Sequence, residues 1–128
     1  GEAVLASTSG STSVLAAAKL NREQVRAKSR EELLEVMNST SVEQEQKNSA
    51  ASAVEKMAET AEQEAAAELL LEAKGFAGCV VSIADGKADV VINAASLDDA
   101  SRAQIEDIVK RKTGIPGENI VIMPSGES

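Results

Sequence analysis

The sequence predicts an α+β fold in which long N-terminal helices lead into an α-β-β-α-β unit. Two stretches rich in Ala, Glu, Leu and Lys contain neither Gly nor Pro, which favours long helices. Two short β-branched runs then flank the pair Asp85-Gly86, a strong signal for a β-hairpin. A capped helical pattern and a final apolar run complete the unit, so we expect a three-stranded sheet that two helices cover on one face. We expect a flexible N-terminal segment at residues 1–13, a helical stalk at residues 14–64 and the α-β-β-α-β unit at residues 65–128.

The first helical pattern starts near Val14, after a Ser/Thr/Gly-rich beginning, and continues to Met37. Its apolar stripe is thin and consists of Val25, Leu33, Val36 and Met37. A helix that is polar around most of its girth is either a solvated stalk or packs on a neighbouring helix.

The second helical pattern begins after the break at residues 38–41 and runs to Lys74, where Gly75 fits the residue that follows a helix C-cap. Two capping-box spacings mark its start, Thr40 with Glu43 and Ser41 with Gln44. Two apolar stripes overlap at Leu69, and we expect the last turns to bury leucines against the sheet. The stripes are Val54, Met57, Ala58, Ala61, Ala65 and Leu69, and Ala66, Leu69, Leu70 and Ala73.

Glu64, Glu68 and Glu72 form a like-charge row on this second helix. The row is either a solvated face or a docking stripe for a basic partner.

Strands are expected at residues 79–84, 87–94 and 120–123, with a type I′ turn at Asp85-Gly86. Ser96 is the expected N-cap of the third helix, and Gly114 ends that helix. The first turn of this helix is acidic, with Asp98 and Asp99, and its last turn is basic, with Lys110, Arg111 and Lys112. Its expected buried stripe consists of Leu97, Ile105, Ile108 and Val109.

Alternation along the strands assigns the two faces of the sheet. The core face carries Cys79, Val81, Ile83, Ala88, Val90, Ile92, Ile120 and Ile122. The opposite face holds more valine than a solvated face needs, and two sheet edges are left unpaired, so both features fit protein association. An ordinary half-solvated face is the alternative. The candidate interface residues are Val80, Ser82, Asp89, Val91, Asn93, Val121 and Met123.

The composition offers little chemistry. The chain contains no His, Trp or Tyr and only one Cys, so no catalytic, cofactor-binding or metal site is expected and we do not expect an enzyme. Cys79 is expected to be a buried strand residue. The net charge of −8 and the near absence of aromatic residues disfavour nucleic-acid binding. No apolar run approaches the roughly 20 residues that span a bilayer, and no signal-peptide pattern is present.

Two further alternatives remain open at this point. Gly114-Ile115-Pro116-Gly117 matches the GxxG loop of KH domains, although the same residues fit a glycine C-cap followed by a proline turn. The alanine-faced second helix also fits a generic helical adaptor that forms a coiled coil.

Several segments resemble the stage III sporulation protein AH family. Residues 21–33 look like the juxtamembrane helix of that family. The segments 74–76, 80–83 and 90–92, with the Asp-Gly turn between the last two, follow the same pattern, as do the helix around 105–109 and the strand 120–122. The resemblance covers roughly residues 20–125.

This resemblance implies a location, a partner and an assembly. Family members sit in the mother-cell membrane of endospore-forming bacteria, with a domain in the intermembrane space that faces the forespore. That domain is similar to the ring-building motif of flagellar and type III secretion basal-body proteins, which has the same α-β-β-α-β order. It binds stage II sporulation protein Q, in a channel that connects the two cells. We therefore expect a structural protein, a ring-type homo- or hetero-oligomer, and membrane attachment only through an N-terminal helix absent from this sequence.

Overall fold

The computed structural model describes residues 10–126 and confirms the predicted order of helices and strands. The elements are α2 (Gly10–Asn38), α3 (Gln44–Ala73), β1 (Cys79–Ala84), β2 (Lys87–Ile92), α4 (Asp99–Thr113), the 3-10 turn η1 (Gly117–Asn119) and β3 (Ile120–Pro124). Helix α2 begins at Gly10, before the predicted start at Val14, so residues 10–13 are helical rather than a flexible lead. The rest of the predicted flexible segment lies outside the described residues.

The sheet has the order β1-β2-β3. Strands β1 and β2 are antiparallel and meet at the predicted turn, where Asp85 (φ 52°) and Gly86 (φ 76°) both adopt the positive φ of a type I′ turn. Strand β3 runs parallel to β2, and α4 makes the crossover between them.

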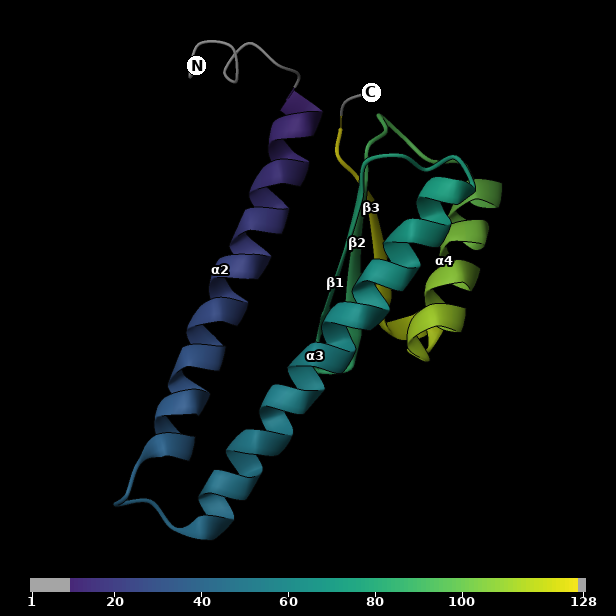
Figure 1. Ribbon diagram of the computed structural model, residues 1–128. Helices are drawn as coiled ribbons and strands as arrows, with labels where there is room; N and C mark the ends of the chain where they lie inside the picture. The colour runs from purple at the N-terminus through teal and green to yellow at the C-terminus, as the bar shows by residue number, and fades with distance from the viewer. Residues whose placement is uncertain (1–9, 127–128) are drawn as a thin grey trace.

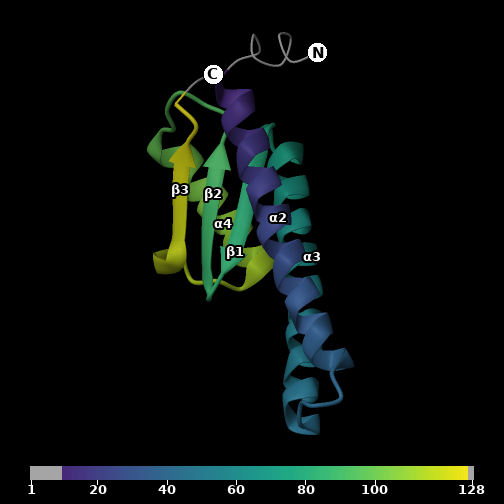
Figure 2. The same cartoon turned by 90° about the vertical axis from the view of Figure 1, so that its left-hand side faces the viewer.

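The helices lie on both sides of this sheet. Figure 1 shows the sheet nearly edge-on, with α3 and α4 on one side and α2 on the other. In Figure 2 α2 lies along β1, at one side of the sheet, and leaves β2 and β3 uncovered in that view. Helices α2 and α3 also pack along one another, so the alanine-rich second helix has its helical partner within the same chain.

The hydrophobic core fills the space between the sheet and helices α3 and α4. Its buried members are Ala67, Leu71, Cys79, Val81, Ala88, Val90, Ile92, Ile105, Ile108, Val109, Ile115 and Ile120. The predicted core face is therefore correct, with Ile83 and Ile122 only partly buried. Val80 was assigned to the opposite face, but its exposed fraction is 1%. Because α2 packs against β1 and buries its own Leu15, this part of the opposite face is covered.

The inward face of α3 differs from both predicted stripes. Its buried residues are Ala50, Glu64, Ala67 and Leu71. Leu69, where the two stripes were expected to meet, is 70% exposed. The prediction that leucines bury in the last turns holds for Leu71, which lies two residues, or about 200°, further around the helix. Helix α3 is continuous through residue 64, and the division into a stalk and a unit at 64/65 stays a prediction.

The helix ends show which capping signals were right. Phe76 N–H donates to Leu71 O at 2.9 Å and Gly75 N–H to Glu72 O at 3.0 Å, which is a Schellman motif at the predicted glycine. Gly114 likewise adopts φ 75° and donates its N–H to Lys110 O at 2.8 Å, as expected.

The predicted N-cap residues of α3 and α4 are wrong. Helix α3 is capped by Glu43 without a side-chain hydrogen bond, and Ser41 N–H donates instead to Ser39 Oγ at 3.2 Å, so neither capping box forms. Helix α4 is capped by Asp98, whose carboxylate accepts from Ser101 N–H at 2.8 Å, rather than by Ser96. Asp is as good an N-cap as Ser, and Asp98 is the residue that immediately precedes the first residue of α4.

Candidate protein interface

Two arginines of α2 meet two glutamates of α3 beside the sheet. Arg26 forms a bidentate pair with Glu64, with Nη1–Oε1 and Nη2–Oε2 distances of 2.8 and 2.9 Å. Arg22 Nη1 lies 3.0 Å from Glu68 Oε2 and 3.5 Å from Glu64 Oε1. The Glu64 side chain is 2% exposed, and the two arginine side chains are 13–14% exposed. The bond to Glu64 is the main cause of a raised pKa of Arg26, although burial acts in the opposite direction. We call these four side chains the edge-capping cluster.

The edge-capping cluster also satisfies three backbone groups on the outer edge of β1. Val81 N–H donates to Glu68 Oε2 at 2.9 Å, and Ile83 N–H donates to Glu64 Oε2 at 2.8 Å. The Val81 carbonyl accepts from Arg22 Nη1 at 2.6 Å. Covering an edge in this way prevents another strand from pairing with it. The prediction of two open sheet edges is therefore wrong for β1.

The edge-capping cluster shows that neither interpretation of the glutamate row holds for Glu64 and Glu68. Glu64 and Glu68 are neither a solvated face nor a dock for a separate basic partner, because their arginines come from α2 of the same chain. Only Glu72 is exposed as expected. The sequence did contain a usable signal. Two Arg and two Glu share the spacing i, i+4 on helices joined by a short turn, so antiparallel packing pairs them.

The edge of β3 is partly occupied as well. Ser125 N–H donates to Ile92 O at 2.8 Å, so Ser125 turns its backbone toward β2. By alternation, Ile122 and Pro124 turn theirs outward. The Ile122 carbonyl accepts from Arg102 Nη1 at 3.1 Å, and Pro124 has no N–H to donate. The β1 edge is therefore largely closed to strand addition, and the β3 edge is closed in part.

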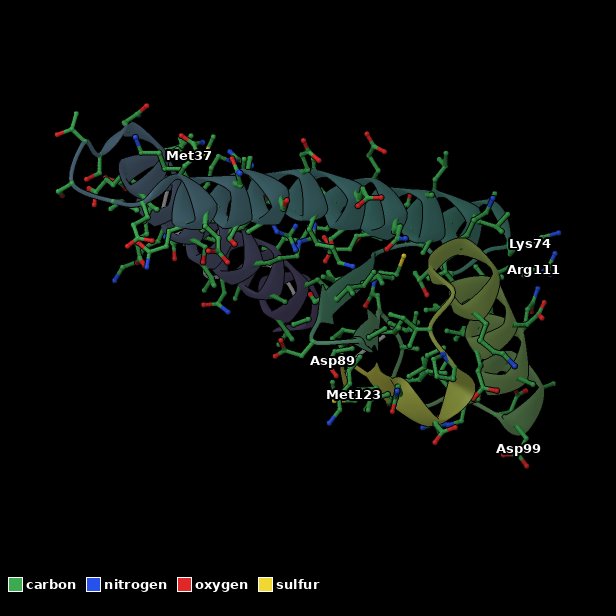
Figure 3. All side chains as sticks on the ribbon, turned by 90° about the horizontal axis from the view of Figure 1, so that it is seen from below. Met37, Lys74, Asp89, Asp99, Arg111 and Met123 are labelled. Carbon is green, nitrogen blue, oxygen red and sulfur yellow. The ribbon has the colours of Figure 1, made fainter. Side chains whose placement is uncertain are left out.

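The uncovered face of β2 and β3 forms one side of a groove with a volume of about 670 Å³. Residues of α2, including Ala18 and Val25, form the opposite wall, and Met57 of α3 also lines the groove. In Figure 3 the labelled residues Asp89 and Met123 lie on the sheet side opposite α4, whereas Arg111 lies beyond α4. We call this hollow the α2–sheet groove.

The structure brings together four of the seven predicted interface residues. Ser82, Asp89, Val91 and Met123 line the α2–sheet groove. Asn93 and Val121 are exposed but do not line it. Val80 is buried beneath α2 and cannot contact a partner in this conformation. Sequence reasoning missed the α2 wall, because Val25 was assigned to a packing stripe while it is 59% exposed.

Other chemistry is limited. Among residues 10–126, no group of three or more His, Cys, Asp or Glu side chains could hold a metal ion. Cys79 is buried, and burial together with the Glu68 and Glu72 carboxylates raises the pKa of its thiol to about 11. None of the helices within the described residues combines the length and the apolar character needed to cross a membrane.

The GxxG sequence is a helix end. Gly114 is the left-handed C-cap of α4, and Pro116 precedes η1, so the loop joins a helix to a strand rather than two helices. A Cβ on Gly117 would lie 2.9 Å from Glu106 Cδ, which places a carboxylate against the loop that a KH domain presents to phosphate.

Comparisons with known proteins give a family and a fold. A family model described as "SpoIIIAH-like protein" matches residues 2–122. A chain of the solved structure "Structure of the SpoIIQ-SpoIIIAH pore forming complex" superimposes with a TM-score of 0.79 at 20% sequence identity, over 90% of this chain and 98% of that chain. A search of curated proteins finds no match. The structural likeness confirms the predicted α+β fold.

Proposed function

The chain belongs to the SpoIIIAH-like family, as its sequence resemblance predicted, and on that premise we propose that it is a non-enzymatic structural component of a sporulation complex that binds SpoIIQ. The observation that carries this proposal is the family match over residues 2–122. The likeness to a chain of the SpoIIQ-SpoIIIAH pore forming complex, over nearly the whole of both chains, supports it. A chain without His, whose α2–sheet groove is lined in part by side chains of an open sheet face, fits a protein that binds another protein.

The finer parts of the proposal concern place and assembly. We place the domain in the space between the mother cell and the forespore, attached to the mother-cell membrane, as a part of a channel. A ring-type oligomer follows from the resemblance to ring-building motifs. The contact surface that we propose for SpoIIQ is the uncovered sheet face, namely Ser82, Asp89, Val91, Asn93, Val121 and Met123.

A pull-down against the extracytoplasmic domain of SpoIIQ tests the function, with the mass of the complex measured by light scattering. We expect retention of this chain and a defined complex mass that exceeds the mass of either protein alone and corresponds to a whole-number ratio of the two. Absence of a complex at micromolar concentrations of both proteins would remove the proposed function. Sedimentation of the isolated complex tests the ring, because a ring gives a discrete multiple of the basic complex whereas a simple heterodimer does not.

A further inference from the structure

The surface that the sheet presents to a neighbouring protein consists mainly of side chains, because many backbone groups at its edges are already bonded. The edge-capping cluster occupies Val81 and Ile83 on β1, while on β3 Arg102 occupies the Ile122 carbonyl and Pro124 has no N–H to donate. Strand addition depends on a row of free N–H and C=O groups. A partner therefore finds the β1 edge largely closed and the β3 edge closed in part, whereas the uncovered sheet face is open to contact (Figure 2).

The α2–sheet groove is the concave part of that face. Val25 on the α2 wall is 59% exposed and Met123 on the sheet side is 42% exposed, and Val91 also lines the groove. Exposed aliphatic side chains that converge on one hollow are typical of a site for an apolar anchor residue. A volume of about 670 Å³ accommodates a few side chains of a projecting loop or hairpin.

The basic and acidic side chains that line the groove differ in whether they are already paired. Arg22 and Arg26 line it, but both are engaged by the glutamates of α3. Asp85 and Asp89 at the sheet end are exposed and form no ion pair among the described residues. Lys56 lies in the lining on α3. The sheet end of the groove thus presents unpaired carboxylates, which favour a cationic side chain on the occupant.

We propose that the α2–sheet groove receives a projecting segment of SpoIIQ that places an aliphatic side chain among Val25, Val91 and Met123 and a Lys or Arg side chain beside Asp89. The segment docks through side chains and adds no strand to the sheet. This inference rests on the proposed function and adds the surface, the wall supplied by α2 and the chemistry of the segment that binds there.

Two groove variants and two matched controls test the inference, with affinity for the SpoIIQ extracytoplasmic domain measured by calorimetry. Val25→Glu and Asp89→Lys each change an exposed groove residue, and both should weaken binding at least about tenfold. Leu69→Glu and Glu62→Lys make the same chemical changes at exposed positions of α3 outside the groove, and both should bind within about twofold of the parent. Arg102→Ala frees the Ile122 carbonyl and should leave affinity unchanged.

Each other outcome has a defined meaning. If the parent chain does not bind SpoIIQ, the proposed function fails and this inference fails with it. If the parent binds and both groove variants bind equally well, only the inference fails. Equal losses in the controls, or tighter binding by Arg102→Ala, would also overturn it, since the first indicates a general charge effect and the second indicates strand addition. A change in self-association alone, with SpoIIQ affinity intact, would assign the groove to a second copy of the chain and overturn the proposal.

Discussion

Removing the carboxylate of Glu64 should destabilise this fold more than any change at an exposed acidic residue. Glu64→Ala deletes both oxygens of the bidentate pair with Arg26 and the acceptor of the Ile83 N–H. It leaves a guanidinium that is 13% exposed without its main partner, and an edge amide of β1 without an acceptor.

The size of the stability loss follows from these two unpaired groups, the Arg26 guanidinium and the Ile83 N–H. Breaking a buried ion pair by removing one partner costs about 3–5 kcal/mol, and the residual exposure of Arg26 places this case near the lower end. An unsatisfied buried N–H costs about 1–3 kcal/mol by itself, but water that enters the vacated space offsets part of it. We therefore expect the free energy of unfolding to fall by about 3–4 kcal/mol. Glu64→Gln keeps an acceptor for Ile83 and should lose roughly half as much.

Urea unfolding of the parent, Glu64→Ala, Arg26→Ala and the double variant measures these terms. The double variant should be more stable than the sum of the two single losses predicts, by at least about 1 kcal/mol, because the pair can be broken only once. Glu62→Ala, at an exposed position of the same helix, serves as the control and should stay within about 0.5 kcal/mol of the parent. A loss under 1 kcal/mol for Glu64→Ala, or strictly additive losses, would refute the assignment of Glu64 as a buried structural carboxylate.

Three further changes test other parts of the structure. Val91→Asp and Val121→Asp should each weaken the complex with SpoIIQ at least about tenfold while leaving the urea midpoint nearly unchanged, and normal binding by both would disprove the face assignment. The Ser101 N–H lowers the pKa of Asp98, so its capping bond stabilises the fold above the unfolded-state pKa near 3.9 and is lost as pH falls through the folded-state value. The stability difference between the parent and Asp98→Ala should therefore shrink in an acid titration below about pH 4, and a constant difference would contradict this. Cys79, with its thiol pKa raised to about 11, should react with a disulfide reagent at pH 8 about a hundredfold more slowly in the folded chain than in urea, and equal rates would show that the thiol is accessible.

The strands and their turn could be predicted because their signals are local. The type I′ turn at Asp85-Gly86 needs positive φ at both residues, and that requirement alone fixed the register of β1 and β2. The alternation of Val81, Ala88 and Val90 then identified the core face. The ends of α3 at Gly75 and of α4 at Gly114 are likewise set by the backbone conformation of a single residue.

The placement of α2 could not be predicted because it depends on partners distant in sequence. Its stripe of apolar residues is too thin to indicate a packing direction, and Val25 turned out to be exposed. The orientation is given instead by Arg22 and Arg26, whose partners lie 38–46 residues away. As a result, the exposure of Val80 and the state of the β1 edge were both assigned incorrectly, and the groove wall was missed.

The edge-capping cluster makes a definite prediction about the division at residues 64/65. A fragment of residues 65–128 lacks Arg22, Arg26 and Glu64, so the amide of Ile83 and the carbonyl of Val81 lose their partners and β1 becomes an open edge. Val80 also loses the cover of α2. We expect this fragment to be less stable than residues 14–128 by more than the Glu64→Ala loss and to self-associate, as measured by urea unfolding and sedimentation. A monomeric fragment that keeps the stability of residues 14–128 would instead show that the division is sound and that α2 is an appended stalk. The predicted instability follows because α2 supplies donors that no residue of 65–128 replaces in the described contacts, which makes the helix part of the folded unit.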